Sequence, residues 1–199
     1  MLALAVATAS DVRALVELRT AVACGLTLRY GHGHWSSEPG EAGVRRGIET
    51  STVLVARQDG TIVGTLRLAT KKPWAIDAAY FAPVRRPLYL VDMAVTPALQ
   101  RRGIGRAMIE EARRIARAYP AGAIRLDAYD ADAGAGGFYA CCGFTEVGRV
   151  VYRGTPLIYF EWLCANDTND RCSPGPRPTG AQPTEGRTHN AEGTCTHCS

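Results

Sequence analysis

Several features are missing from this sequence, and each absence excludes a class of protein. The sequence has no run of about 20 apolar residues, the length needed to span a membrane. The apolar opening, residues 1–10, lacks a basic region and is short for the core of a signal peptide, so we expect a strand there. The formal net charge is only +4, and no basic stripe interleaved with aromatic residues predicts nucleic-acid binding. We therefore expect a cytoplasmic protein that binds neither membranes nor nucleic acid.

The cysteine pattern argues against two kinds of structural support. The seven cysteines are odd in number and have no spacing typical of a disulfide framework, so free thiols are expected. The final CTHC, with His189 upstream, is a single cluster, whereas a zinc site needs two ligand pairs inside a foldable unit. His32 and His34 have no further ligand at a suitable spacing. No metal is predicted.

Composition changes sharply near residue 163. Residues 1–163 are apolar and periodic, whereas residues 164–199 are rich in Pro, Gly, Thr and Asn and nearly free of large apolar side chains. A segment of that kind cannot bury enough apolar surface to offset the entropy lost on ordering. We predict one globular domain, residues 1–163, followed by a disordered tail, residues 164–199.

Strands and helices alternate in the predicted domain. β-branched runs flank Asp59-Gly60 and predict a hairpin. Residues 88–95, LYLVDMAV, form a nearly continuous apolar run typical of a buried central strand. Residues 103–119 carry the apolar stripe of a helix, whereas residues 24–37 have no clean period and are read as a loop or broken helix. The pattern favours an α+β sheet with helices on both sides.

The segment QRRGIG, residues 100–105, lies where the central strand gives way to the next helix. The first N–H groups of a helix have no internal partner, and the helix dipole adds partial positive charge. Gly103 and Gly105 remove Cβ atoms at this point, which favours close approach of a phosphate or pyrophosphate. A tight turn with solvated arginines is the alternative. The arginines concerned are Arg101, Arg102 and Arg106.

A second motif follows in FYACCGF, which contains Phe138-Tyr139 and Gly143-Phe144. The pattern Gln/Arg-x-x-Gly-x-Gly/Ala in residues 100–105 and this aromatic-Tyr pair before Gly-Phe resemble, in this order, the GNAT superfamily of acyl-CoA-dependent N-acetyltransferases. The P-loop motif GxxxxGK[ST] and the dinucleotide motif GxGxxG are both absent. The resemblance covers residues 1–163. It implies a mixed, mostly antiparallel sheet of about six to seven strands whose central strands splay apart.

The resemblance also implies a donor, acetyl-CoA, and roles for particular residues. Backbone amides of residues 102–106 would hold the pyrophosphate, and a backbone N–H near residues 93–95 would polarise the acetyl carbonyl. Tyr139 would protonate the departing thiolate, with a packed core tyrosine as the alternative. Asp132 stands where many members of the family have asparagine. The implied donor-binding residues are Met93, Ala94, Val95, Gln100, Arg101, Arg102, Gly103, Ile104, Gly105, Arg106 and Asp132.

Two acidic residues are candidates for the base that deprotonates the attacking amine. Asp92 stands inside an apolar run, where burial would raise its pKa and suit it to this role. It could equally cap backbone amides or orient the amine. Asp127, on the following strand, is the second candidate, acting through water, or else a solvent-facing strand residue.

Two variable segments, residues 29–35 and residues 71–87, are expected to recognise the acceptor. Aromatic faces and carboxylates favour an ammonium group, although loop packing would explain each residue singly. The candidates are Tyr30, His32, His34, Trp35, Trp74, Asp77 and Tyr80.

The predicted function is transfer of acetyl to a primary amine of a small molecule. The transfer is expected to be direct, in a ternary complex, because no cysteine stands where the family would place a nucleophile. Acetylation of a peptide or protein amine, and a non-catalytic domain that binds or senses acyl-CoA, are the alternatives. Edge strands such as the last pair could join two copies as a homodimer.

Overall fold

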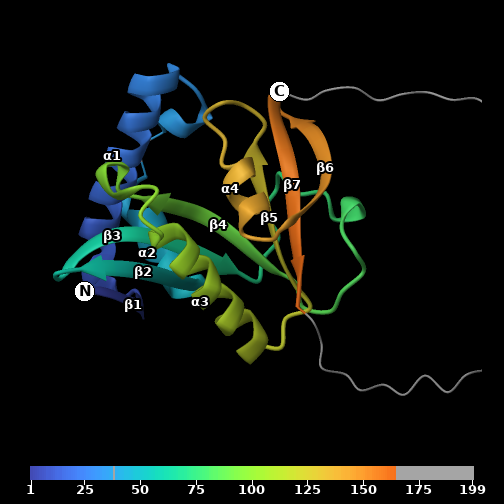
Figure 1. Ribbon diagram of the computed structural model, residues 1–199, viewed down its shortest axis with the longest axis horizontal. Coiled ribbons are helices and arrows are strands. Elements are labelled where there is room, and N and C mark those ends of the chain that lie inside the picture. The colour runs from blue at the N-terminus through green and yellow to red at the C-terminus, as the bar shows by residue number, and fades with distance from the viewer. Residues whose placement is uncertain (38, 165–199) are drawn as a thin grey trace, which may run out of the picture. The chain divides into compact units, whose positions relative to one another are not determined.

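The structure, a computed structural model, describes residues 1–37 and 39–164 of the 199-residue chain (Figure 1). The predicted tail lies outside these residues except for Cys164, and so does its cysteine and histidine cluster. Cys164 belongs to the folded part, because its side chain is buried and its N–H donates to the carbonyl of Gly122 at 3.0 Å. No helix of the described part is long and apolar enough to cross a membrane.

A seven-stranded sheet with the order β1-β2-β3-β4-β5-β7-β6 forms the centre of the domain. All neighbouring strands run antiparallel except β4 and β5, which run parallel. This confirms the predicted mixed, mostly antiparallel sheet. The strands are β1 (Leu2–Val6), β2 (Thr52–Gln58), β3 (Thr61–Ala69), β4 (Leu88–Val95), β5 (Ala123–Tyr129), β6 (Thr145–Tyr152) and β7 (Thr155–Leu163).

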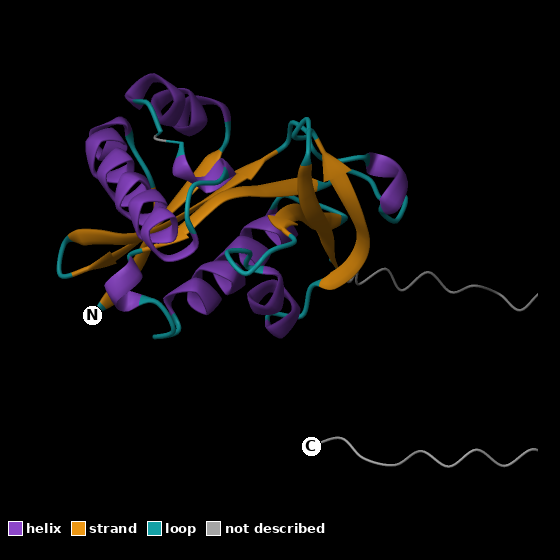
Figure 2. Cartoon of the chain, turned by 90° about the horizontal axis from the view of Figure 1, so that it is seen from above, coloured by secondary structure: helices purple, strands orange, loops and turns teal. Residues whose placement is uncertain are grey.

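Helices cover both faces of this sheet (Figure 2). On one face, α1 (Val12–Tyr30) and α2 (Glu41–Thr50) enclose a cluster of buried aliphatic side chains with β2 and β3. On the other face, α3 (Ile104–Ala118) and α4 (Gly136–Cys141) pack on the main core. The short 3₁₀ helices are η1 (Ala9–Asp11), η2 (His34–Ser36), η3 (Ala78–Tyr80) and η4 (Pro97–Leu99).

The predicted hairpin and the predicted helix after QRRGIG are both confirmed. Asp59 and Gly60 have positive φ, 51° and 83°, as the tight turn between β2 and β3 requires. The predicted apolar stripe of α3 is buried against the sheet. Its buried residues are Ile104, Met108, Ile109, Ala112 and Ala116.

The prediction of a loop or broken helix over residues 24–37 is wrong for its first half, because α1 continues to Tyr30. Packing overrides the weak apolar period there. A Cβ on Gly25 would lie 3.4 Å from Pro97 Cγ, so the helix passes close to η4. Thr27 Oγ1 donates back to the carbonyl of Ala23 at 2.8 Å, and Gly31, with φ 79°, ends the helix.

Strands β4 and β5 separate at the centre of the sheet. They pair only at Leu88 with Ile124 and at Tyr89 with Arg125. Beyond Tyr89 the strands diverge (Figure 1), so one side of the β4 backbone has no strand partner. The register of β4 on β3 also shifts in this region, where Asp92 has φ 55°. The predicted splaying of the central strands is confirmed.

Candidate active site

The amino end of α3 presents backbone N–H groups that the helix does not use. The first bond into the helix runs from Ala107 N–H to the carbonyl of Gly103 at 3.0 Å, and no side chain caps this end. The N–H groups of residues 104–106 therefore lack intrahelical acceptors. Together with the helix dipole, they give this end the chemistry of an anion site.

Glycine is required at the two positions of QRRGIG for different structural reasons. Gly103 has φ 83°, a left-handed conformation that L-residues with a Cβ adopt only at a cost. Gly105 is needed for packing, because a Cβ there would lie 3.1 Å from Phe138 Cζ and 3.3 Å from Met93 Cε. Gly103 thus shapes the turn, whereas Gly105 brings α3 close to α4 and β4.

The side chains around this helix end mostly support the backbone. Gln100 Nε2 donates to the carbonyl of Val95 at 3.1 Å and so ties the turn to the end of β4. Arg106 donates to the carbonyl of Cys141 at 3.4 Å, which links α3 to α4. Arg101, with φ 60°, and Arg102 are exposed.

The unpaired side of β4 faces the gap between β4 and β5. Thr96 N–H donates to Val63 on β3 at 2.9 Å, and strand N–H groups alternate in direction. Val95 and Met93 therefore direct their N–H groups toward the gap, and Ala94 directs its own toward β3. Two of the three predicted β4 positions can thus hold an extended ligand backbone or a carbonyl oxygen.

Tyr139 reaches this gap from α4. Its side chain is buried among Phe138, Phe144 and Phe160, and its hydroxyl donates to Met93 Sδ at 3.7 Å. Burial, and secondarily the charge of Asp127, raises the pKa of the phenol well above its ordinary value. Tyr139 therefore keeps its proton at neutral pH.

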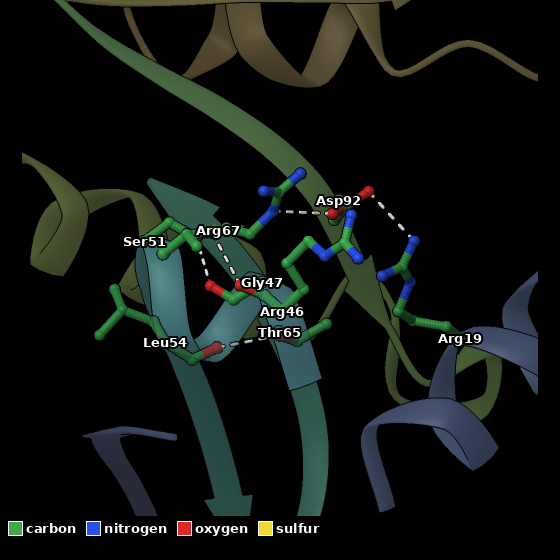
Figure 3. Close-up of polar contacts among 9 residues, drawn as sticks. Arg19, Arg46, Gly47, Ser51, Leu54, Thr65, Arg67 and Asp92 are labelled. Atoms are coloured by element: carbon green, nitrogen blue, oxygen red, sulfur yellow. Dashed lines mark hydrogen bonds and ion pairs between the residues drawn. The ribbon is translucent and has the colours of Figure 1, made fainter. Parts of the chain in front are cut away.

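The expectation that Asp92 is a buried carboxyl is wrong. The Asp92 side chain is 31% exposed at the bulge of β4. Its two oxygens accept from Arg19 Nη2 at 3.1 Å and from Arg67 Nε at 2.9 Å (Figure 3). Both carboxylate oxygens of Asp92 are therefore already engaged by guanidinium groups.

Asp127 has the environment that was expected for Asp92. It is half-buried on β5, and burial raises the pKa of its carboxyl above the ordinary value. Its position on β5, past the last residue paired with β4, places it beside the gap. Asp127 is therefore the candidate base that lies partly buried beside the gap.

Part of the first predicted acceptor segment lies beside Asp127. His34 stacks on Tyr129 with ring centroids 6.5 Å apart, and Trp35 meets the same ring edge-on at 5.5 Å. The His34 ring is also hydrogen-bonded to Thr155 Oγ1. The other two candidates do not join this contact: His32 is exposed, and Tyr30 lies under the guanidinium of Arg29 at 5.1 Å.

The second predicted segment lies on the other side of Asp127. Tyr80 packs edge-on against Tyr159, the β7 partner of Asp127, with ring centroids 5.4 Å apart. Asp77 accepts from Ala79 N–H at 3.0 Å as the cap of η3, whereas Trp74 is 85% exposed. The observed roles are thus packing for Tyr80 and capping for Asp77.

Asp132 lies exposed in the turn between β5 and α4. No group of three or more His, Cys, Asp or Glu side chains in the described ranges is arranged to hold a metal ion.

Sequence reasoning missed Arg19 and Arg67. Like Asp92, each is a charged residue among apolar neighbours in the sequence. Arg19 follows Leu18 in the apolar stretch of α1, and Arg67 interrupts the apolar end of β3. Partial burial of a charge indicates that it is paired or binds something.

Comparisons with known proteins agree with this geometry. The family model described as the acetyltransferase (GNAT) family matches residues 23–144. No curated protein matches the chain.

Solved structures with similar folds are numerous. PaiA N-acetyltransferase from Thermoplasma acidophilum, in complex with coenzyme A, has a TM-score of 0.65 at 15% identity, covering 82% of this chain and 99% of that one. Ribosomal-protein-alanine N-acetyltransferase from Brucella melitensis has a TM-score of 0.63 at 19% identity, covering 81% and 99%. YncA, a putative acetyltransferase from Salmonella typhimurium with its cofactor acetyl-CoA, has a TM-score of 0.62 at 18% identity, covering 82% and 94%.

Proposed function

The chain belongs to the acetyltransferase (GNAT) family, and from this premise we propose that it transfers acetyl from acetyl-CoA to a primary amine of a small molecule. The observation that carries the proposal is the gap between β4 and β5, which has free backbone N–H groups on β4 and the Tyr139 hydroxyl beside it. A small acceptor is favoured because aromatic side chains flank Asp127 on both sides, through Tyr129 and Tyr159.

The donor is proposed to bind along the gap and at the amino end of α3. The N–H groups of residues 104–106 suit a pyrophosphate, and the gap is lined by strand backbone that suits an amide-containing arm. The similar proteins from T. acidophilum and S. typhimurium were solved with coenzyme A and with acetyl-CoA, respectively. Asp132 would contact only the periphery of the bound donor.

Three groups of this chain would carry the chemistry. The N–H groups of Met93 and Val95 would polarise the thioester carbonyl and stabilise the negative charge that develops on its oxygen. Asp127, through water, would accept the proton of the amine as the new C–N bond forms. Tyr139 would give its proton to the sulfur as the C–S bond breaks. Asp92, held by its two arginines, is assigned to orientation of the acceptor.

The test is release of free CoA thiol from acetyl-CoA with and without a panel of primary amines that includes amino acids, polyamines, aminoglycosides and short peptides. We expect release that depends on the amine and is faster with small amines than with peptides. Binding of acetyl-CoA without amine-dependent release would support a sensor instead. Faster release with peptides would support a peptide acceptor.

We predict that Gly103→Ala weakens donor binding. A Cβ at φ 83° is strained by about 1–2 kcal/mol, and relief of that strain would turn the N–H groups of residues 104–106 away from the ligand. The expected result is about a tenfold increase in the Kd of acetyl-CoA by calorimetry, equivalent to about 1.4 kcal/mol. Gly60→Ala is the matched control, because Gly60 has the same φ in a hairpin turn away from the gap. An equal change in Kd for both variants would contradict the proposed cradle.

We predict that Asp127→Asn lowers kcat/KM by about 100-fold, as loss of a general base does. The wild-type rate should rise with pH as this carboxyl ionises at a pKa above its ordinary value, and that limb should be missing in the variant. A raised folded-state pKa stabilises the fold below the unfolded pKa, and this contribution is lost as pH rises through the folded pKa. Asp127→Asn should therefore leave the free energy of unfolding at neutral pH unchanged or raise it. An unchanged pH profile would count against the assignment.

A further inference from the structure

Two arginines from different elements meet at Asp92 (Figure 3). Arg19 of α1 and Arg67 of β3 each bind one carboxylate oxygen, at 3.1 and 2.9 Å. The side chains of Arg19 and Arg67 are each only 29% exposed, so their charges are partly withdrawn from water.

Asp92 neutralises only one of these two charges. Two guanidinium groups bound to one carboxylate leave an excess of positive charge. A guanidinium has five N–H donors, yet Arg19 uses only Nη2 and Arg67 only Nε for hydrogen bonds within the described ranges. Arg149 is a useful contrast, because its guanidinium binds both Glu146 and Asp130.

Arg19 and Arg67 line a pocket beside Asp92. Leu15 and Val44 form apolar walls, and Thr65 and Asp92 lie on the sheet side with Arg67. Its enclosed space is about 20 Å³, on the order of one water-sized group, so a ligand's charged group would sit at the mouth. Asp92 directly precedes Met93, whose N–H faces the gap, and strand residues are about 3.3 Å apart. An amine bound in the gap would therefore lie close to the guanidinium groups.

We propose that the acceptor amine carries an anionic group, a carboxylate or a phosphate, and that Arg19 and Arg67 bind it. This inference rests on the proposed acetyltransferase function and specifies its substrate class. Planar guanidinium forks match both anions, and Asp92 keeps the two arginines oriented before the acceptor arrives. A purely structural clamp between α1, β3 and β4 would explain the two ion pairs, but not the unused donors that face the pocket.

The first experiment compares matched acceptors with the wild-type full-length chain, using release of CoA thiol. The pairs are amino acids against their carboxamides, and O-phosphoethanolamine against ethanolamine, with spermidine as a cationic amine. We expect kcat/KM to be at least about 30-fold higher for the anionic member of the preferred pair. Carboxylate and phosphate are distinguished by which pair responds, and either response supports the proposal. Equal rates within every pair, or a preference for spermidine, would overturn it while leaving the acetyltransferase function intact.

The second experiment removes the charges one at a time. Arg67→Gln and Arg19→Gln should lower kcat/KM for the anionic acceptor by about 30- to 100-fold, mainly through KM, and bring the ratio within the pair toward one. Arg13→Gln is the matched control, because Arg13 is an exposed α1 residue that pairs with Glu17. Binding of acetyl-CoA should be unchanged in all three. A loss that is equal for anionic and neutral acceptors would indicate a structural clamp and overturn the proposal.

If the arginine variants fail to fold, the comparison of matched acceptors with the wild-type chain still tests the proposal. Absence of CoA release with every amine, despite acetyl-CoA binding, would contradict the proposed function itself. That result differs from turnover without preference for anionic acceptors, which contradicts only the substrate class.

Discussion

Tyr139→Phe is expected to lower kcat for amine acetylation by about 1,000-fold, within the range typical of general acid catalysis. The phenol is buried beside Met93 at the gap and is protonated at neutral pH, so it would be a proton donor next to the departing sulfur. Without it the sulfur must leave as an anion in a site shielded from water. The KM for acetyl-CoA should change little, because the phenylalanine ring retains the packing with Phe138 and Phe160. Steady-state CoA release measures both constants.

The matched control for this variant is Tyr89→Phe. Tyr89 is also a buried tyrosine, but it belongs to the cluster with Ile76 and Phe81 rather than to the gap. Its replacement should leave kcat within about threefold of the wild type. If Tyr139→Phe also stayed within threefold, Tyr139 would be a packed core residue and the proton would come from elsewhere.

Glu161→Gln is expected to lower the free energy of unfolding by about 3–5 kcal/mol. Glu161 Oε1 accepts from Arg125 Nε at 2.9 Å, and the two side chains are only 5% and 6% exposed. The amide would leave the buried guanidinium without a counter-charge. Glu161 Oε2 also accepts from Ala82 N–H at 3.2 Å, so the same change loosens the segment that carries Tyr80. Urea unfolding followed by fluorescence or circular dichroism gives the difference.

Glu146→Gln serves as the control for this stability measurement. Its pair with Arg149 is exposed, so the loss of this pair should leave the free energy of unfolding nearly unchanged. The double variant Arg125→Met/Glu161→Leu should recover much of the loss, because it removes both buried charges. A loss below about 1 kcal/mol for Glu161→Gln would mean that the Arg125 charge is solvated by other means.

The donor side of the site was largely predictable because it depends on backbone and local sequence. A glycine with positive φ before a helix, and an amphipathic stripe after it, are written in consecutive residues, as in Gly103 and residues 104–118. The separation of β4 from β5 was expected only through the family resemblance. Nothing in either strand alone indicates that pairing stops after Tyr89.

The acceptor side was predicted less well because it depends on contacts between distant elements. Asp92 looked buried in a one-dimensional apolar run, but a bulge turns it outward to Arg19, 73 residues earlier in the chain. Aromatic residues of the 71–87 segment suggested a cation site, whereas Tyr80 packs on Tyr159. The structure instead brings Arg19 and Arg67 to Asp92 beside the gap. Only the fold brings those arginines together.

The most direct measurement of the central claim is a product count. Wild-type protein is incubated with acetyl-CoA and the preferred amine, and mass spectrometry quantifies acetylated amine while a thiol reagent quantifies free CoA. We predict one acetylated amine for each CoA released, with no acetyl group left on the protein. Acetyl-CoA binding with no acetylated amine, or CoA release without a matching product, would contradict it.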